Sequence, residues 1–124
     1  MNSRVVLGVR ILFGVFCIIF GVNKFLNFLP MPTIPGDGGQ LMQIYFTSGF
    51  MSIIGILEIL GGVALVANKF VPIALTVLAA IMFNALVFHL LHDMAGIGGA
   101  VLGCVLTIIL VFAYKERLSS VLTA

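Results

Sequence analysis

Four long apolar runs dominate the pattern of hydrophobic and polar positions along this chain, and polar residues gather between them. The runs cover residues 5–22, 50–67, 71–91 and 97–113. At 1.5 Å per residue, the shortest run makes a helix about 25 Å long, which is close to the thickness of a bilayer core. The pattern therefore predicts four membrane-spanning helices.

Two of the three connections between these runs are short. Residues 68–70 and 92–96 make tight turns, and Pro72 lies near the first turn of the third helix, where its missing N–H is harmless. Short turns place consecutive helices antiparallel. We therefore expect an all-α, up-down-up-down four-helix bundle that forms a single membrane domain over residues 1–124.

The remaining connection, residues 23–49, is long and rich in proline and glycine. Its middle, from Leu29 to Gln40, holds three prolines and three glycines, so we expect no helix there and interpret the segment as an outer loop. The short apolar piece 41–46 that follows would lie along the membrane interface or dip back between helices.

Composition supports the membrane assignment and excludes a water-soluble enzyme. Hydrophobic residues make up 62% of the chain and charged residues 8%, whereas a soluble domain carries about a quarter charged residues. The net charge of +2 and the absence of a basic run give no sign of nucleic-acid binding. Cys17 and Cys104 lie inside apolar runs and form no C-x-x-C pair, so we interpret them as small buried hydrophobes.

The distribution of charges predicts the orientation of the chain. The first run is long for a signal peptide and contains Arg10, so we expect it to be a retained span. An N-in, C-in orientation leaves only Lys24 among the basic residues on the outer side. The cytoplasmic side then collects the other basic residues, namely Arg4, Arg10, Lys69, Lys115 and Arg117.

Ionisable residues inside the spans are the candidates for function, because each is unfavourable in lipid unless it is paired or hydrated. Glu58 is the strongest, since the helical rise places it about 12 Å from the outer end of the second span, near the midplane. A carboxylate at this depth needs a cation, several hydrogen-bond donors or a proton. Arg10 and Lys24 have stems long enough to reach it or to snorkel outward, so which of them pairs with Glu58 stays open.

The third span adds further polar candidates. Asn84 lies about 10 Å below the outer end of this span, near the depth of Glu58, and would either bond another helix or bind a ligand. His89 and His92 share one helical face beside Asp93. These three are only a weak metal-site candidate, because zinc needs a further ligand, and we expect no metal.

Small residues recur at helical spacing in three of the spans. The fourth span has a small residue at every fourth position, namely Ala95, Gly99, Gly103 and Thr107. The first two spans carry glycines seven residues apart, namely Gly14 with Gly21 and Gly55 with Gly62. Such faces allow helices to approach closely, either within one bundle or in a homo-oligomer.

A series of short motifs runs in order along nearly the whole chain. It comprises Arg10 with Phe13, Gly21-x-x-Lys24, Glu58-Ile59-Leu60-Gly61, Pro72, Asn84 with Phe88-His89, and Tyr114-x-x-Arg117. Together with the four spans, these motifs resemble the DoxX family of small bacterial membrane proteins. The resemblance implies a four-helix, multi-pass protein of the bacterial cytoplasmic (inner) membrane. Its recurring polar positions, and so its candidate ligand-binding residues, would be Arg10, Lys24, Glu58, Asn84 and His89.

The resemblance also implies a redox setting. The family takes its name from a subunit associated with thiosulfate:quinone oxidoreductase, and its members are described as quinone-linked redox proteins. The wider clan is similar to eukaryotic membrane proteins that help cargo export or receptor assembly without redox chemistry. Because this chain has no thiol pair and no recognisable flavin or haem motif, we expect at most a quinone-binding or anchoring subunit of an oxidoreductase.

Three functions stay open on the sequence. The leading hypothesis is a membrane subunit of a quinone-linked redox system with a membrane or periplasmic partner protein. Its outer half would hold a polar pocket for a quinone or a lipid headgroup, lined by Lys24, Glu58 and Asn84. The alternative is a non-enzymatic assembly or scaffolding factor whose polar residues only lock the bundle. A small-solute transporter is the third, although four spans without discontinuous helices argue against it.

Overall fold

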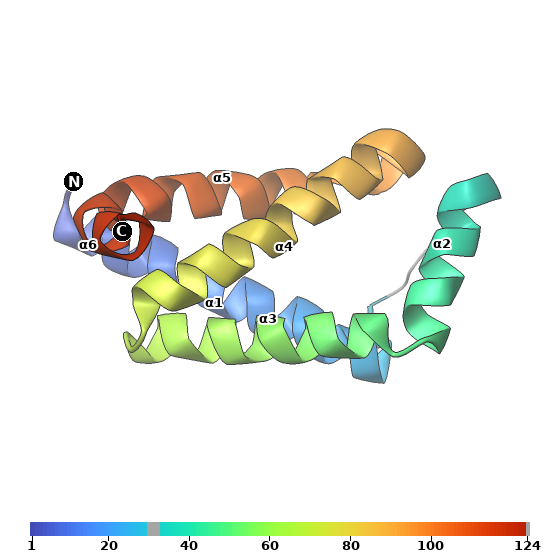
Figure 1. The fold of residues 1–124 in the computed structure, drawn as a ribbon, viewed down its shortest axis with the longest axis horizontal. Helices are drawn as coiled ribbons and strands as arrows, with labels where there is room; N and C mark the ends of the chain where they lie inside the picture. The colour runs from blue at the N-terminus through green and yellow to red at the C-terminus, as the bar shows by residue number, and fades with distance from the viewer. Residues whose placement is uncertain (30–32, 124) are drawn as a thin grey trace.

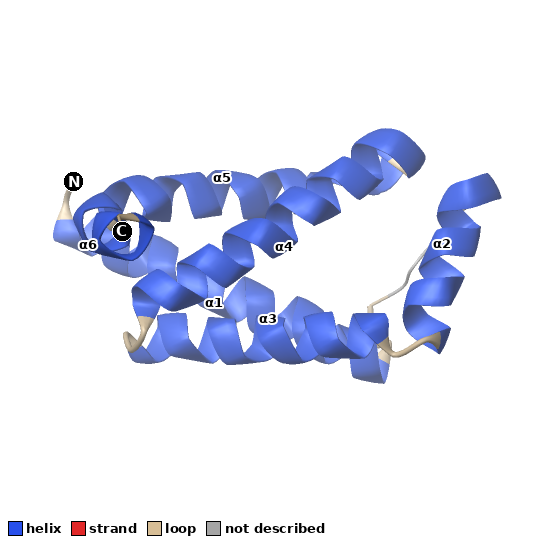
Figure 2. Ribbon diagram, in the orientation of Figure 1, coloured by secondary structure: helices blue, strands red, loops and turns tan. Residues whose placement is uncertain are grey.

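The structure is a computed structural model that describes residues 1–29 and 33–123. The described residues form helices and connecting loops, with no strand (Figure 2). In chain order the helices are α1 (Ser3–Leu26), α2 (Gly36–Thr47), α3 (Phe50–Ala67), α4 (Val71–His92), the 3₁₀ helix η1 (Met94–Gly96), α5 (Ile97–Ala113) and α6 (Lys115–Leu122).

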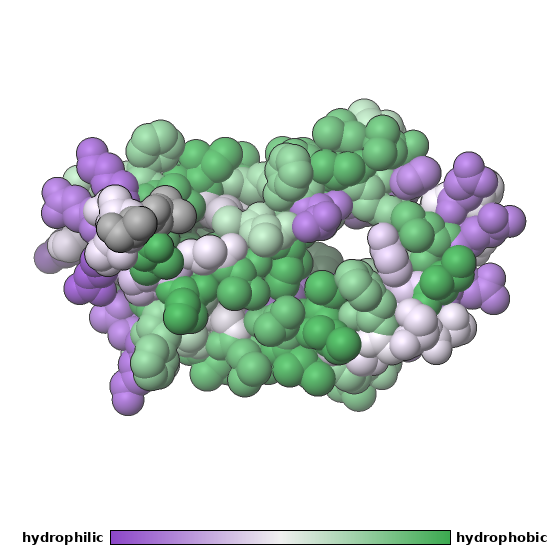
Figure 3. Space-filling model, viewed as in Figure 1, coloured by the Kyte–Doolittle hydropathy of each residue, from purple (hydrophilic) through white to green (hydrophobic). Residues whose placement is uncertain are grey.

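Four helices are long and apolar enough to cross a membrane: α1, α3, α4 and the segment Met94–Ala113, which joins η1 to α5. The apolar runs 50–67 and 97–113 coincide with α3 and α5, while α1 extends past both ends of its run. Apolar side chains cover the middle of the visible face and polar ones gather toward its two ends (Figure 3). The prediction of an all-α chain with four apolar helices of spanning length, which indicates a multi-pass membrane protein, is confirmed.

The helices pack around one apolar core. Helix α1 contacts α3 and α5, and α4 contacts the same two helices. Both chain termini, α6 and the α3–α4 turn lie at one end of the molecule, which we call the terminal end, while α2 and η1 lie at the opposite end (Figure 1). Fully buried side chains between the helices include Phe13, Cys17, Leu75, Leu78 and Leu110.

The closest contact in the bundle joins α1 and α3 through two pairs of glycines. A Cβ atom added at Gly14 would lie 2.9 Å from the backbone oxygen of Gly62, and one at Gly21 would lie 2.8 Å from that of Gly55. Side chains at these positions would push the two helices apart. The glycine faces expected from the seven-residue spacing therefore meet each other directly.

Helix α2 begins inside the segment that was predicted to contain no helix, so that prediction is wrong for residues 36–40. Pro35 precedes the helix with extended backbone, where its missing N–H removes no hydrogen bond, and Asp37 lies in the first turn, where the helix dipole favours a carboxylate. A Cβ atom at Gly38 would lie 2.7 Å from that of His92. Glycine at this position thus lets α2 approach the end of α4.

The rest of the predicted outer loop 23–49 is also shorter than expected. Helix α1 continues to Leu26, and the buried Asn23 accepts a hydrogen bond of 2.8 Å from the backbone N–H of Leu29. The apolar piece 41–46 belongs to α2. Pro30 and Pro32, which contributed to the loop prediction, lie outside the described residues.

A final helix, α6, was not predicted from the sequence pattern. The chain turns at Tyr114, and α6 then lies across the end of the bundle, so that Figure 1 shows it end-on. Lys115, Glu116 and Arg117 are exposed, whereas Leu118 is buried against the core. A short helix with one polar face and one buried apolar residue is typical of a segment that lies at a membrane surface.

The glycine contact between α1 and α3 leads to a first prediction. In Gly62→Ala the new Cβ would meet the backbone oxygen of Gly14 and lie 2.8 Å from Ile18 Cγ1. A backbone atom cannot rotate away, so we expect the free energy of unfolding in detergent micelles to fall by about 1–3 kcal/mol. The control is Gly8→Ala, because nothing lies within 4 Å of that position. Equal destabilisation by both variants would show that the contact does not limit stability.

Candidate functional site

The buried carboxylate of Glu58 forms an ion pair with the ammonium group of Lys24, across the interface of α1 and α3. Glu58 is 2% exposed, and the side chain of Lys24 is 15% exposed. Lys24 Nζ also lies 3.5 Å from the backbone oxygen of Phe20, one turn earlier in α1. The question left open by the sequence is thereby answered: the partner of Glu58 is Lys24.

Glycines create the space in which this ion pair sits. A Cβ atom at Gly21 would lie 3.1 Å from Glu58 Cβ, and one at Gly55 would lie 3.3 Å from Lys24 Cβ. The same glycine pair that brings α1 against α3 therefore leaves room for the stems of both charged side chains. Close helix packing and ion pairing depend on one local feature of the sequence.

Lys24 is the one charged group paired with Glu58 in the described part of the chain. Within that part, the ammonium group of Lys24 lies against Glu58 Oε1, and no second donor reaches the carboxylate. An ionised carboxyl group offers about four lone-pair positions to donors, so much of its accepting capacity stays unused. Chemically, this group can take up a proton or accept a hydrogen bond from a ligand that reaches it.

Arg10 makes its contact with α3 at another position of the α1–α3 interface. It is 6% exposed, and its guanidinium donates a hydrogen bond to the backbone oxygen of Leu65 in the last turn of α3. The same oxygen also accepts a hydrogen bond of 3.3 Å from the backbone N–H of Asn68 at the end of α3, where the helix dipole favours a cation. The side chain of Arg10 thus caps α3 near the terminal end of the bundle.

The structure does not join Asn84 to the Lys24–Glu58 pair. The Asn84 side chain is exposed, and its amide donates a hydrogen bond of 2.9 Å to the backbone oxygen of Ala80 in its own helix. This local bond satisfies the polar group without a second helix. Of the three residues predicted to line the outer pocket, Lys24 and Glu58 meet, and Asn84 makes no contact with either among the described hydrogen bonds.

The histidines at the end of α4 form a local cluster. His89 Nδ1 lies 3.2 Å from Asp93 Oδ2 and 3.1 Å from the backbone oxygen of Asp93. The rings of His89 and His92 each lie 5.5 Å from the ring of Phe88. No group of three His, Cys, Asp or Glu side chains within residues 1–29 and 33–123 is arranged to hold a metal. The weak candidates His89, His92 and Asp93 therefore gain no support as a metal site.

The two glycines proposed for packing in α5 differ. A Cβ atom at Gly103 would clash with Met82 Sδ and lie 3.2 Å from a ring carbon of Phe16, so this position holds α5 close to both α4 and α1. At Gly99 the nearest atom would be 3.8 Å away, which is an ordinary contact. Gly103 therefore has the packing role, and Gly99 leaves more space beside α1.

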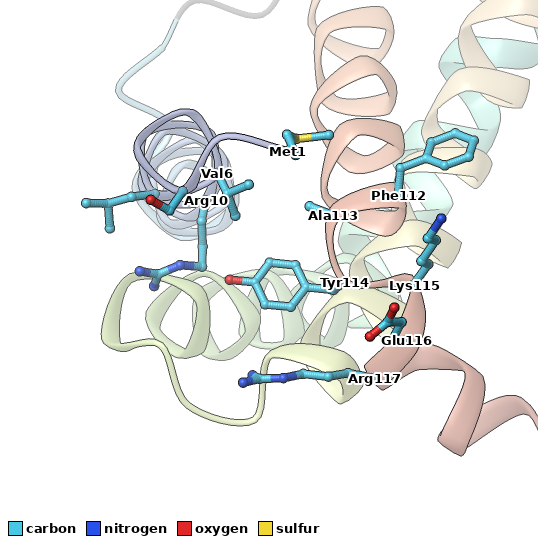
Figure 4. Close-up of a pocket in the computed structure, with 11 residues that line it drawn as sticks. Met1, Val6, Arg10, Phe112, Ala113, Tyr114, Lys115, Glu116 and Arg117 are labelled. Carbon is cyan, nitrogen blue, oxygen red and sulfur yellow. The ribbon is translucent and has the colours of Figure 1, made fainter.

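A cavity of about 860 Å³ lies at the terminal end, between the start of α1 and the junction of α5 and α6. Its lining includes Arg10, Tyr114, Lys115, Glu116 and Arg117 (Figure 4). The guanidinium carbon of Arg117 lies 5.8 Å from the centre of the Tyr114 ring. The sequence pattern did not predict this cavity, because its walls come from opposite ends of the chain and α6 carries no long apolar run.

No family model, curated protein or solved structure matches this chain. The resemblance to the DoxX family therefore stays a prediction from the sequence motifs.

The Lys24–Glu58 pair leads to a second prediction. Lys24→Met leaves a buried carboxylate without its cation, so we expect the free energy of unfolding to fall by about 3 kcal/mol. Lys24→Met/Glu58→Leu removes both charges, and we expect its stability to return to within about 1 kcal/mol of the unmodified protein. Denaturant titration in micelles measures both. Strict additivity of the Lys24→Met and Glu58→Leu effects would contradict the pairing, and Glu116→Leu supplies the control for an exposed glutamate.

Proposed function

We propose that this protein is a non-catalytic membrane subunit that scaffolds or assembles a partner protein. The proposal rests on the partners of the buried charged side chains, which all belong to the bundle itself. Lys24 and Glu58 neutralise each other between α1 and α3, and Arg10 caps the last turn of α3. Polar groups that serve the bundle in this way leave its long apolar faces to meet lipid and a protein partner.

The proposal includes a membrane arrangement. Both termini lie at the same end of the molecule, which is what an up-down-up-down bundle with an N-in, C-in orientation requires (Figure 1). The basic residues of the α3–α4 turn and of α6 would then face the cytoplasm, in agreement with the positive-inside rule. The bacterial inner membrane and the DoxX family are the setting that the sequence motifs favour.

A quinone-linked redox subunit is the second candidate, and one observation favours it. The carboxylate of Glu58 is buried, and within the described residues the ammonium group of Lys24 is its one polar partner. A carboxyl group in this state would exchange a proton with a quinone, or accept a hydrogen bond from the reduced ring.

The experiment that separates the two functions starts with protein purified in a mild detergent. Organic solvent extracts its bound quinones, and mass spectrometry measures their molar ratio to protein. Under the scaffolding proposal this ratio stays at background and does not differ between the unmodified protein, Glu58→Gln and the exposed control Glu116→Gln. Near-stoichiometric quinone that disappears only in Glu58→Gln would overturn scaffolding in favour of the redox subunit.

A second measurement tests the scaffolding role directly. We expect membranes of a strain that lacks this protein to contain less of a partner protein, while quinone-dependent electron transfer per remaining partner is unchanged. Quantitative proteomics of membranes reports the first quantity and a dye-reduction assay the second. An unchanged membrane proteome in the deletion strain would rule out the assembly function.

A further inference from the structure

The terminal cavity lies where a membrane protein meets lipid headgroups. Its walls are the first turns of α1, the end of α5 and the start of α6. Since α1 and α5 are of spanning length, their ends reach the surface of the bilayer, and α6 lies across that end. The cavity therefore opens at the depth of the polar headgroups.

The charges that line the cavity favour an anion. Arg10, Lys115 and Arg117 contribute three positive charges, against one negative charge from Glu116. Tyr114 extends from the α5–α6 junction toward the region that Arg10 enters from α1, and Arg117 runs beside Tyr114 in the same direction (Figure 4). Lys115 points away from this group. Arg10, Tyr114 and Arg117 thus line one cavity from α1, the α5–α6 junction and α6.

Arg10 supplies an independent sign of a ligand. It is nearly completely buried, yet its described hydrogen bond uses only Nη1, toward Leu65. A guanidinium has five N–H donors, and the bond to Leu65 is the one side-chain hydrogen bond of Arg10 among the described residues. Such a fork matches the oxygen atoms of a phosphate group, and a buried cation gains most from an anion that reaches it.

Apolar side chains complete the lining and indicate the kind of molecule that carries the anion. Val6 and Leu7 from α1, with Phe112 and Ala113 from α5, lie on the same cavity as the basic residues. A volume of about 860 Å³ falls within the usual range for ligand pockets. An inorganic anion would use only the basic part, whereas a lipid would place its phosphate there and its glycerol and upper acyl carbons on the apolar part.

We propose that the terminal cavity binds the phosphate headgroup of an anionic phospholipid, and that Arg10, Tyr114 and Arg117 are the residues that bind it. This site is separate from the Lys24–Glu58 pair, and it does not depend on whether the subunit scaffolds a partner or binds a quinone. A bound lipid would join α1 to α6, two segments from opposite ends of the chain. Anionic headgroups also attract basic residues at the membrane surface in general, so the test must separate a site from a charged surface.

The test is native mass spectrometry of delipidated protein titrated with phosphatidylglycerol or phosphatidylcholine. We expect the unmodified protein to bind one phosphatidylglycerol at least tenfold more tightly than phosphatidylcholine. Arg117→Gln removes one charged donor and should weaken phosphatidylglycerol binding roughly tenfold, and Tyr114→Phe should weaken it a few-fold. These variants leave the bond from Arg10 to Leu65 in place, so we expect both to fold, and thermal unfolding checks this.

The matched control is Lys69→Gln, which removes an exposed positive charge at the same end of the bundle but outside the cavity. We expect it to bind phosphatidylglycerol as the unmodified protein does. Equal losses in Lys69→Gln and Arg117→Gln would overturn the site and show attraction to surface charge alone. Displacement of the lipid by millimolar inorganic phosphate would also overturn the proposal, because it would assign the cavity to a free anion.

Discussion

The approach of α1 to α3 at two pairs of glycines is the contact on which the rest of this molecule depends. In a bilayer, burial of apolar side chains between helices gives little driving force, because lipid tails are as apolar as the helices. Association must come from close backbone packing and from polar contacts. The glycine pairs at 14/62 and 21/55 allow the close backbone packing. They also make the polar contacts possible, because they bring Lys24 to Glu58 and Arg10 to the end of α3.

The two cations of α1 act on α3 in different ways. Lys24 neutralises the buried charge of Glu58, while Arg10 donates a second hydrogen bond to the backbone oxygen of Leu65. One contact lies toward each end of the α1–α3 interface, so together they fix how far one helix can slide along the other. Register between antiparallel spans is thus set by polar groups, and the apolar residues between them need only fit.

The sequence predicted the spans well and the arrangement of polar residues poorly, for identifiable reasons. The length of an apolar run predicts the length of the helix directly. For this reason the runs 50–67 and 97–113 predicted the bounds of α3 and α5 correctly. The partner of Glu58 depends on which face of α1 meets α3, and this is the face that carries Gly14 and Gly21. The amide of Asn84 bonds within its own helix, which the position of Asn84 along the span does not reveal. Helix α2 forms despite its glycines because these allow close contact with Ile34 and His92.

The positions of the buried charges bear on where function can lie. At the Lys24–Glu58 pair both charges have a protein partner, so a ligand there must compete with an existing ion pair or use only the spare lone pairs of the carboxylate. At the terminal cavity Arg10 is equally buried but meets only a neutral backbone oxygen, so its positive charge has no partner of opposite sign among the described ion pairs. Electrostatics therefore favours the terminal end for an anionic ligand. The α1–α3 interface, with its charges already balanced, is better suited to holding the bundle together.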